Sequence, residues 1–135
     1  MAELSNIKKM LEKDWFVVIP SQYTQFDALA ELIRQMSGNK KENIKVVDIS
    51  GKLSKLSFIM LKKTPYVMKN LDLNKKSLKS LIEIIILPDQ KVFSIGSKTQ
   101  NKKDKNKAID DVLKTLNEII ENREEIERDN LSMYR

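Results

Sequence analysis

The residues with the most chemical potential lie around Pro88, where acidic side chains and a lysine are close together. Asp89 and Lys91 follow a hydrophobic run that contains Glu83. A metal-dependent nuclease needs carboxylates at a strand end and on the next strand, with a lysine nearby, to hold magnesium and position water. That chemistry requires two separated acidic positions, whereas here one aspartate serves both the Pro-Asp and the Asp-x-Lys patterns. We therefore interpret Pro88-Asp89-Gln90 as a turn and predict no metal site.

A second chemical candidate is a serine–lysine pair formed by Ser54 or Ser57 with Lys55. A desolvated lysine can act as the base for a hydroxyl nucleophile. Neighbouring residues of a strand point to opposite faces, however, so the adjacency of Ser54 and Lys55 argues against a working pair. The three glycines are also isolated from one another, so no glycine-rich loop is available to bind phosphate.

Two residue types that dominate catalysis are missing, because the 135 residues include no cysteine and no histidine. Their absence excludes disulfides, thiolate nucleophiles, the common zinc sites and any histidine general base within this chain. We therefore predict a non-enzymatic protein without a cofactor.

Positive charge is concentrated in the middle of the sequence. Residues 36–110 carry seventeen lysines against seven acidic residues, whereas 1–35 have a net charge of −1 and 111–135 of −3. Lysines displace condensed counterions from nucleic acid, so this region predicts binding to nucleic acid or another polyanion. The selected nucleic-acid-binding residues are Lys40, Lys41, Lys45, Lys102, Lys103, Lys105 and Lys107.

A solvated lysine surface is the competing interpretation of the same residues. The chain has 21 lysines against 4 arginines, a ratio that AT-rich coding sequence produces without selection for binding. Arginine, which reads guanine edges, is absent from residues 36–110. Phe58 and Phe93 lie in strand-like runs beside lysines, but hydrophobic packing explains both better than base stacking does.

Hydrophobic periodicity indicates the helices and strands that must position these residues. We expect helices at 1–14 and from a cap at Ser21 or Thr24 to Gly38, a strand at 15–20, and a loop at 64–80. Two strand pairs are predicted as hairpins: 44–49 with 53–62, and 81–87 with 91–95. The second pair should be central, because its first strand is apolar on both faces except at Glu83.

A long amphipathic helix is predicted near the C-terminus. Its apolar stripe consists of Ile109, Val112, Leu113, Leu116, Ile119 and Ile120. From Asn122 on, the sequence is mostly charged, and we divide the chain into a domain at 1–121 and a helical extension at 122–135. In this extension, Arg123, Ile126 and Leu131 could contact a protein partner or a second copy of the chain. The alternative function is therefore an interaction or assembly subunit, which could form a homodimer.

The predicted fold is of the α+β class: a mainly antiparallel sheet of four to six strands, N-terminal helices and the long C-terminal helix. Residues 1–14 are amphipathic instead of continuously apolar, and no apolar run is long enough to span a membrane. We therefore expect a cytoplasmic protein that does not use a membrane as a partner.

Overall fold

The computed structural model describes residues 2–21, 24–53, 55–71, 75–88, 91–94, 97–100 and 105–133. The helices are α1 (Ala2–Leu11), α2 (Phe26–Met36), the 3₁₀ turn η1 (Lys41–Asn43), α3 (Pro65–Asn70), α4 (Lys76–Lys79) and α5 (Lys105–Met133). The strands are β1 (Trp15–Pro20), β2 (Ile44–Ser50), β3 (Lys55–Lys62), β4 (Ile82–Leu87), β5 (Lys91–Ser94) and β6 (Ser97–Gln100).

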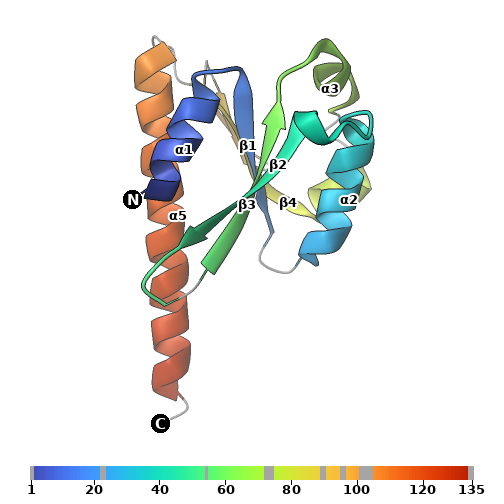
Figure 1. The fold of residues 1–135 in the computed structure, drawn as a ribbon. Helices are drawn as coiled ribbons and strands as arrows, with labels where there is room; N and C mark the ends of the chain where they lie inside the picture. The colour runs from blue at the N-terminus through green and yellow to red at the C-terminus, as the bar shows by residue number, and fades with distance from the viewer. Residues whose placement is uncertain are drawn as a thin grey trace.

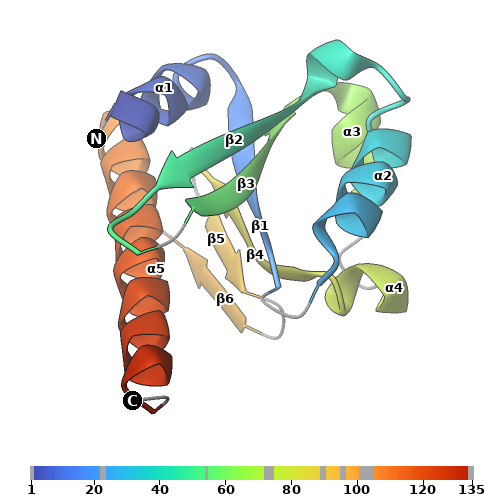
Figure 2. The ribbon, with the colours of Figure 1, turned by 60° about the horizontal axis from the view of Figure 1, so that its bottom comes forward.

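The strands form one sheet with the order β2-β3-β1-β4-β5-β6, and every recorded pair is antiparallel. The sheet has helices on both faces (Figures 1 and 2). This arrangement confirms the predicted α+β class, the two hairpins and the interior position of β4. All six residues of β1 are buried, as expected for a strand with a neighbour on each side and helices on each face.

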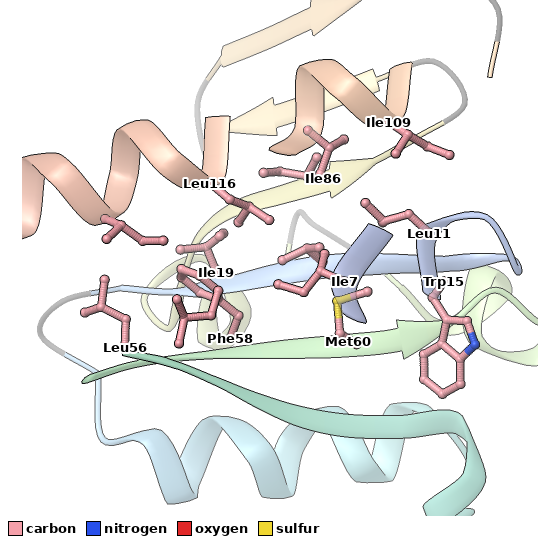
Figure 3. Packing of buried hydrophobic residues seen from close by; sticks show 14 residues of the cluster. Ile7, Leu11, Trp15, Ile19, Leu56, Phe58, Met60, Ile86, Ile109 and Leu116 are labelled. Atoms are coloured by element: carbon pink, nitrogen blue, oxygen red, sulfur yellow. The ribbon is translucent and has the colours of Figure 1, made fainter. Parts of the chain in front are cut away.

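Helices α1 and α5 cover one face of the sheet, and their apolar stripes form the first core with it (Figure 3). Ile7 and Leu11 of α1 are fully buried, and so is Leu116 of α5. Phe58 of β3 has no exposed surface, so it belongs to the core, as predicted. The periodicity of α5 was therefore a reliable guide to the face that it buries.

Helices α2, α3 and α4 cover the opposite face and contribute to a second core. Leu29 and Ile33 of α2 pack with Phe16 and Val18 of β1, all four without exposed surface. Residues of β1 alternate between the two cores because successive strand residues point to opposite faces. The sheet is therefore the middle of three layers.

The predicted loop at 64–80 is wrong, because this segment contains α3 and α4. Thr64 caps α3: its hydroxyl oxygen accepts the backbone N–H of Val67 at 3.1 Å. Pro65 occupies the first turn, where its missing N–H is not needed. Each helix buries one main apolar residue in the second core, Val67 from α3 and Leu78 from α4. Helices this short show no periodicity, and tertiary contact stabilises them.

The expected cap of α2 is also wrong. Gln25 occupies the N-cap position without a side-chain bond, and the Thr24 hydroxyl instead donates to the carbonyl of Leu81 at 3.0 Å. That bond joins the end of β1 to the segment before β4. The C-terminal prediction is confirmed, because Gly38 follows the helix with φ of 82°. Strand β6, at the edge of the sheet, was not predicted.

Helix α5 is the longest element, with 29 residues, and its C-terminal part extends past the sheet (Figures 1 and 2). It is continuous through the predicted boundary at 121/122. Within the part of the chain that is described, no helix is both long and apolar enough to cross a membrane.

Candidate nucleic-acid interface

Antiparallel pairing brings six segments, distant in sequence, to one end of the sheet. Strand β1 begins there and β3 ends there, since Trp15 pairs with Lys62 and the Lys63 N–H donates to the carbonyl of Asp14 at 2.7 Å. Strand β2 begins beside them, where Ile44 pairs with Leu61. Helix α5 also starts at this end, because the Lys105 ammonium donates to the carbonyl of Glu12 at 2.9 Å.

Helices α2 and α3 complete the same end. The side-chain amide of Asn43 donates to the carbonyl of Ser37 at 3.1 Å, which ties the end of α2 to η1. A Cβ on Gly38 would lie 3.4 Å from Cε1 of Tyr66, so α3 lies directly against the turn after α2. In Figure 1 these segments all lie at the top of the molecule, opposite the C-terminus of α5.

Lysines concentrate on this surface, which we call the basic end. Among the residues that the structure describes, its acidic residues are Glu12, Asp14 and Glu42. The lysines of the basic end are Lys13, Lys40, Lys41, Lys45, Lys62, Lys63 and Lys105. All of them except the half-buried Lys63 have exposed side chains. Because lysines outnumber acids there by more than two to one, the basic end presents a positive field.

Four of the predicted lysines, Lys40, Lys41, Lys45 and Lys105, meet at the basic end although they come from three separate elements. Lys107 is exposed in the first turn of α5, but it lies two residues from Lys105, and residues at that spacing do not share a helix face. Lys102 and Lys103 lie outside the described residues. The prediction of these residues as ligands of nucleic acid stays a prediction.

Sequence reasoning missed Lys13, Lys62 and Lys63, which the fold places in the same surface. Lys62 lies two residues beyond Met60, the partner of Lys45, so Lys45 and Lys62 are diagonal neighbours on one face of the sheet. Lysines at strand ends can be grouped into one surface only after the strands have been paired correctly. The hairpin of β2 and β3 was predicted, so Lys62 was within reach of that reasoning.

Trp15 supports the position of Lys45. The Lys45 ammonium lies 5.4 Å from the centroid of the indole, within the range of a cation–π contact. Trp15 is only 8% exposed and belongs to the first core. Figure 3 shows its ring at the edge of that core, away from the α5 residues. A buried ring therefore supports a charged group that remains at the surface.

A hollow of 560 Å³ lies on the α3 side of the basic end. It lies between the turn after α2 and the start of α3, and its lining includes Gly38, Lys40, Glu42, Thr64 and Tyr66. Tyr66 is 53% exposed, whereas its neighbour Val67 is fully buried in the second core. The volume is within the range of ligand pockets, roughly 300 to 1,000 Å³.

The opposite end of the molecule carries charges of both signs. A hollow of 660 Å³ lies between the β2–β3 turn and α5, and Glu121, Glu124 and Glu125 line it. Glu124 is only 8% exposed, and its carboxylate accepts the backbone N–H of Lys52. Lys52 and Arg128 line the same hollow, so charges of both signs meet there.

The three residues predicted to bind a partner have different environments. Ile126 and Leu131 are 44% and 62% exposed on the part of α5 that extends past the sheet. Arg123 instead bonds within the chain: its guanidinium donates to the carbonyl of Pro20 at 3.2 Å and to Glu83 at 3.0 Å. Arg123 and Glu124 therefore attach α5 to the sheet beyond residue 121.

Of the other chemical candidates, Ser57, Lys55 and Glu83 make structural contacts, whereas Ser54 and Asp89 lie outside the described residues. The Ser57 hydroxyl donates to the Asp48 carboxylate at 2.6 Å, and Lys55 forms an ion pair with Asp48 at 3.3 Å. These two partners, the Ser57 hydrogen bond foremost, lower the pKa of Asp48 below its ordinary value. Glu83 pairs with Arg123. Among the described residues, no group of three or more metal-ligating side chains is close enough to hold an ion.

Comparison with known proteins gives no independent guide to function: no family model, no curated protein and no solved structure matches the chain.

Proposed function

We propose that this protein is a non-enzymatic accessory or regulatory protein that binds nucleic acid or another polyanion through the basic end. The observation that carries the proposal is the convergence of seven lysines from separate segments on one end of the sheet. Six of these seven lysines have exposed side chains, so they can reach a phosphate backbone.

The chemistry of the basic end favours phosphate contacts over base readout. Its cations are lysines, which act as point charges, whereas bidentate recognition of guanine is a property of arginine. Arg34 and Arg123 form ion pairs within the chain. We therefore expect binding that is steeply dependent on salt and nearly indifferent to sequence.

The test compares two variants with the same change in charge. In the first, Lys40, Lys41, Lys45 and Lys62 of the basic end are replaced by glutamine. In the control, glutamine replaces Lys52, Lys75, Lys76 and Lys79, which are exposed at the other end of the sheet. Lys105 is left unchanged because its ammonium bonds to the chain itself. Affinity for a labelled DNA duplex is measured by anisotropy as a function of salt.

The first variant should lose affinity on every sequence, and its salt dependence should become shallower by about 3 units, given about 0.9 per phosphate neutralised. The control variant should keep the wild-type slope. Equal losses in both variants would mean that binding follows net charge and not the basic end. If the wild-type protein binds neither DNA, RNA nor heparin at about 50 mM salt, the proposal fails.

A second candidate function, an interaction subunit, is favoured by the exposed Ile126 and Leu131. Large apolar side chains on a helix that extends past the body of a protein are typical of a partner-binding surface. Removing residues 125–135 keeps the bonds of Arg123 and Glu124. The truncated protein should therefore stay folded by circular dichroism, and a change from dimer to monomer in sedimentation would favour this candidate. An unchanged oligomeric state would count against self-association through α5.

A further inference from the structure

We propose that the ligand of the basic end is a single-stranded nucleic acid, and that one of its bases stacks on Tyr66 in the adjacent hollow. This inference rests on the proposed function and gives it a substrate class. Single-strand-binding surfaces combine cations that follow the backbone with exposed aromatic rings on which bases stack. The basic end has both features within one surface.

Tyr66 is the aromatic side chain that this surface presents to solvent. Val67 turns into the second core, and because consecutive helix residues point about 100° apart, Tyr66 is directed away from that core. Its ring lies against Gly38, where a Cβ would be 3.4 Å from Cε1, in van der Waals contact with the ring. The backbone of Gly38 therefore supports the ring on one side while 53% of the residue stays exposed.

Lysines surround the ring at positions that suit a phosphate backbone. Lys40 lines the same hollow as Tyr66, and Lys41 follows it in η1. Lys69 is not one of the seven lysines of the basic end, but it is exposed and lies three residues after Tyr66 in α3, which puts both on one side of that helix. A single strand of nucleic acid that lies across these lysines would bring an unpaired base over the ring. The bases of a duplex are stacked on one another and are not available to stack on Tyr66.

The hollow also contains one acidic residue, Glu42, whose charge opposes a phosphate. It is exposed, so its effect is screened by salt, and the neighbouring lysines outnumber it. Replacing Glu42 by glutamine should therefore strengthen binding to any strand without affecting the preference for bases. The opposite hollow at Glu124 is lined by three carboxylates, Lys52 and Arg128, and its lining contains no aromatic ring.

The experiment separates bases from phosphates. Anisotropy is measured with a thymidine strand of about 12 nucleotides, within the roughly 4 to 16 that a single-strand-binding fold contacts, and with an abasic strand that has the same number of phosphates. Wild type should prefer the thymidine strand. Tyr66→Ala should weaken binding to that strand about tenfold, as expected for the loss of one stacked base, and leave the abasic strand unchanged.

Two variants serve as matched controls. Tyr66→Phe keeps the ring and should keep the affinity, and Met68→Ala removes an exposed apolar residue of the same helix, 41% exposed, without effect. An upfield shift of the Tyr66 ring protons in NMR spectra on addition of the thymidine strand would report stacking in the unmutated protein.

The outcomes distinguish this inference from the proposed function. If wild type binds a duplex or heparin but neither single strand, the inference fails while the proposed function stands; if it binds none of these, both fail. If wild type binds both strands equally and Tyr66→Ala has no effect, the inference is overturned while polyanion binding stands. If wild type prefers thymidine but Tyr66→Ala does not weaken it and the ring protons do not shift, the bases bind elsewhere and Tyr66 is not the platform.

Discussion

Glu124 offers the sharpest test of how α5 is attached to the sheet. The residue is 8% exposed, and its carboxylate accepts the backbone N–H of Lys52 in the β2–β3 turn. A hydrogen bond to a charged group contributes about 1.5 to 3 kcal/mol to stability. Because Lys52 lies in an exposed turn, water can replace the lost acceptor, and alanine is the better helix former by a few tenths of a kcal/mol. Glu124→Ala should therefore destabilise the protein by about 1 to 2 kcal/mol.

Urea unfolding followed by the fluorescence of Trp15 measures this loss. With a slope of about 1 to 3 kcal/mol per M, the midpoint should fall by about 1 M. Glu124→Gln keeps an oxygen acceptor without its charge and should lose about half as much, since charge-assisted bonds are roughly twice as strong as neutral ones. The Lys52 amide should also exchange faster with solvent in Glu124→Ala.

Glu125→Ala is the matched control, because it removes an exposed carboxylate from the next position of the same helix. Its effect should stay within about 0.5 kcal/mol, as for most surface substitutions. If Glu124→Ala is as stable as Glu125→Ala and the exchange of the Lys52 amide is unchanged, the bond does not hold the turn against α5. The attachment of α5 past residue 121 would then rest on Arg123 alone.

Three other measurements test the fold. Leu116→Ala should lower the free energy of unfolding, measured in urea, by about 2 to 5 kcal/mol, because the side chain is fully buried. Ile84→Ala should lower it less, because Ile84 is half-buried. Equal small losses in both variants would contradict the first core. The pKa of Asp48, measured by NMR titration, should lie below the ordinary 3.8, and Ser57→Ala should raise it. Because the pKa of Asp48 is lower in the folded state, its ionised carboxylate stabilises the fold at pH values above the ordinary pKa. This stabilisation is lost as the pH falls through the lowered pKa. Gly38→Ala should destabilise by about 1 to 2 kcal/mol, because φ of 82° is unfavourable for alanine; an unchanged melting temperature would refute that strain.

The candidate site could be predicted from the sequence only in part. The excess of lysine in the middle region pointed to a polyanion, and Lys40, Lys41 and Lys45 are close enough in sequence to be grouped directly. Lys13 was left out because it lies in a segment of net negative charge, and only the pairing of β1 with β3 brings it beside Lys63. Tyr66 was missed because its segment was interpreted as a loop.

The sequence by itself determined the elements whose apolar residues repeat over many positions. Helix α5 and strand β1 are such elements: a stripe at helical spacing or a continuous β-branched run specifies both the conformation and the buried surface. The division of the residues of β1 between two cores, and with it the presence of helices on both faces, became clear only from the structure. The composition, which contains no cysteine and no histidine, also excluded the chemistry of these two residues from the chain.

Tertiary structure alone decided the features that depend on contacts between distant segments. Helices α3 and α4 exist because Val67 and Leu78 find the second core, since helices of this length are not stable in isolation. Arg123 and Glu124 looked like part of a charged extension, and their roles became visible only with their partners at Pro20 and Lys52. The basic end has the same origin: antiparallel strands bring the start of one to the end of the next, so lysines far apart in sequence become neighbours.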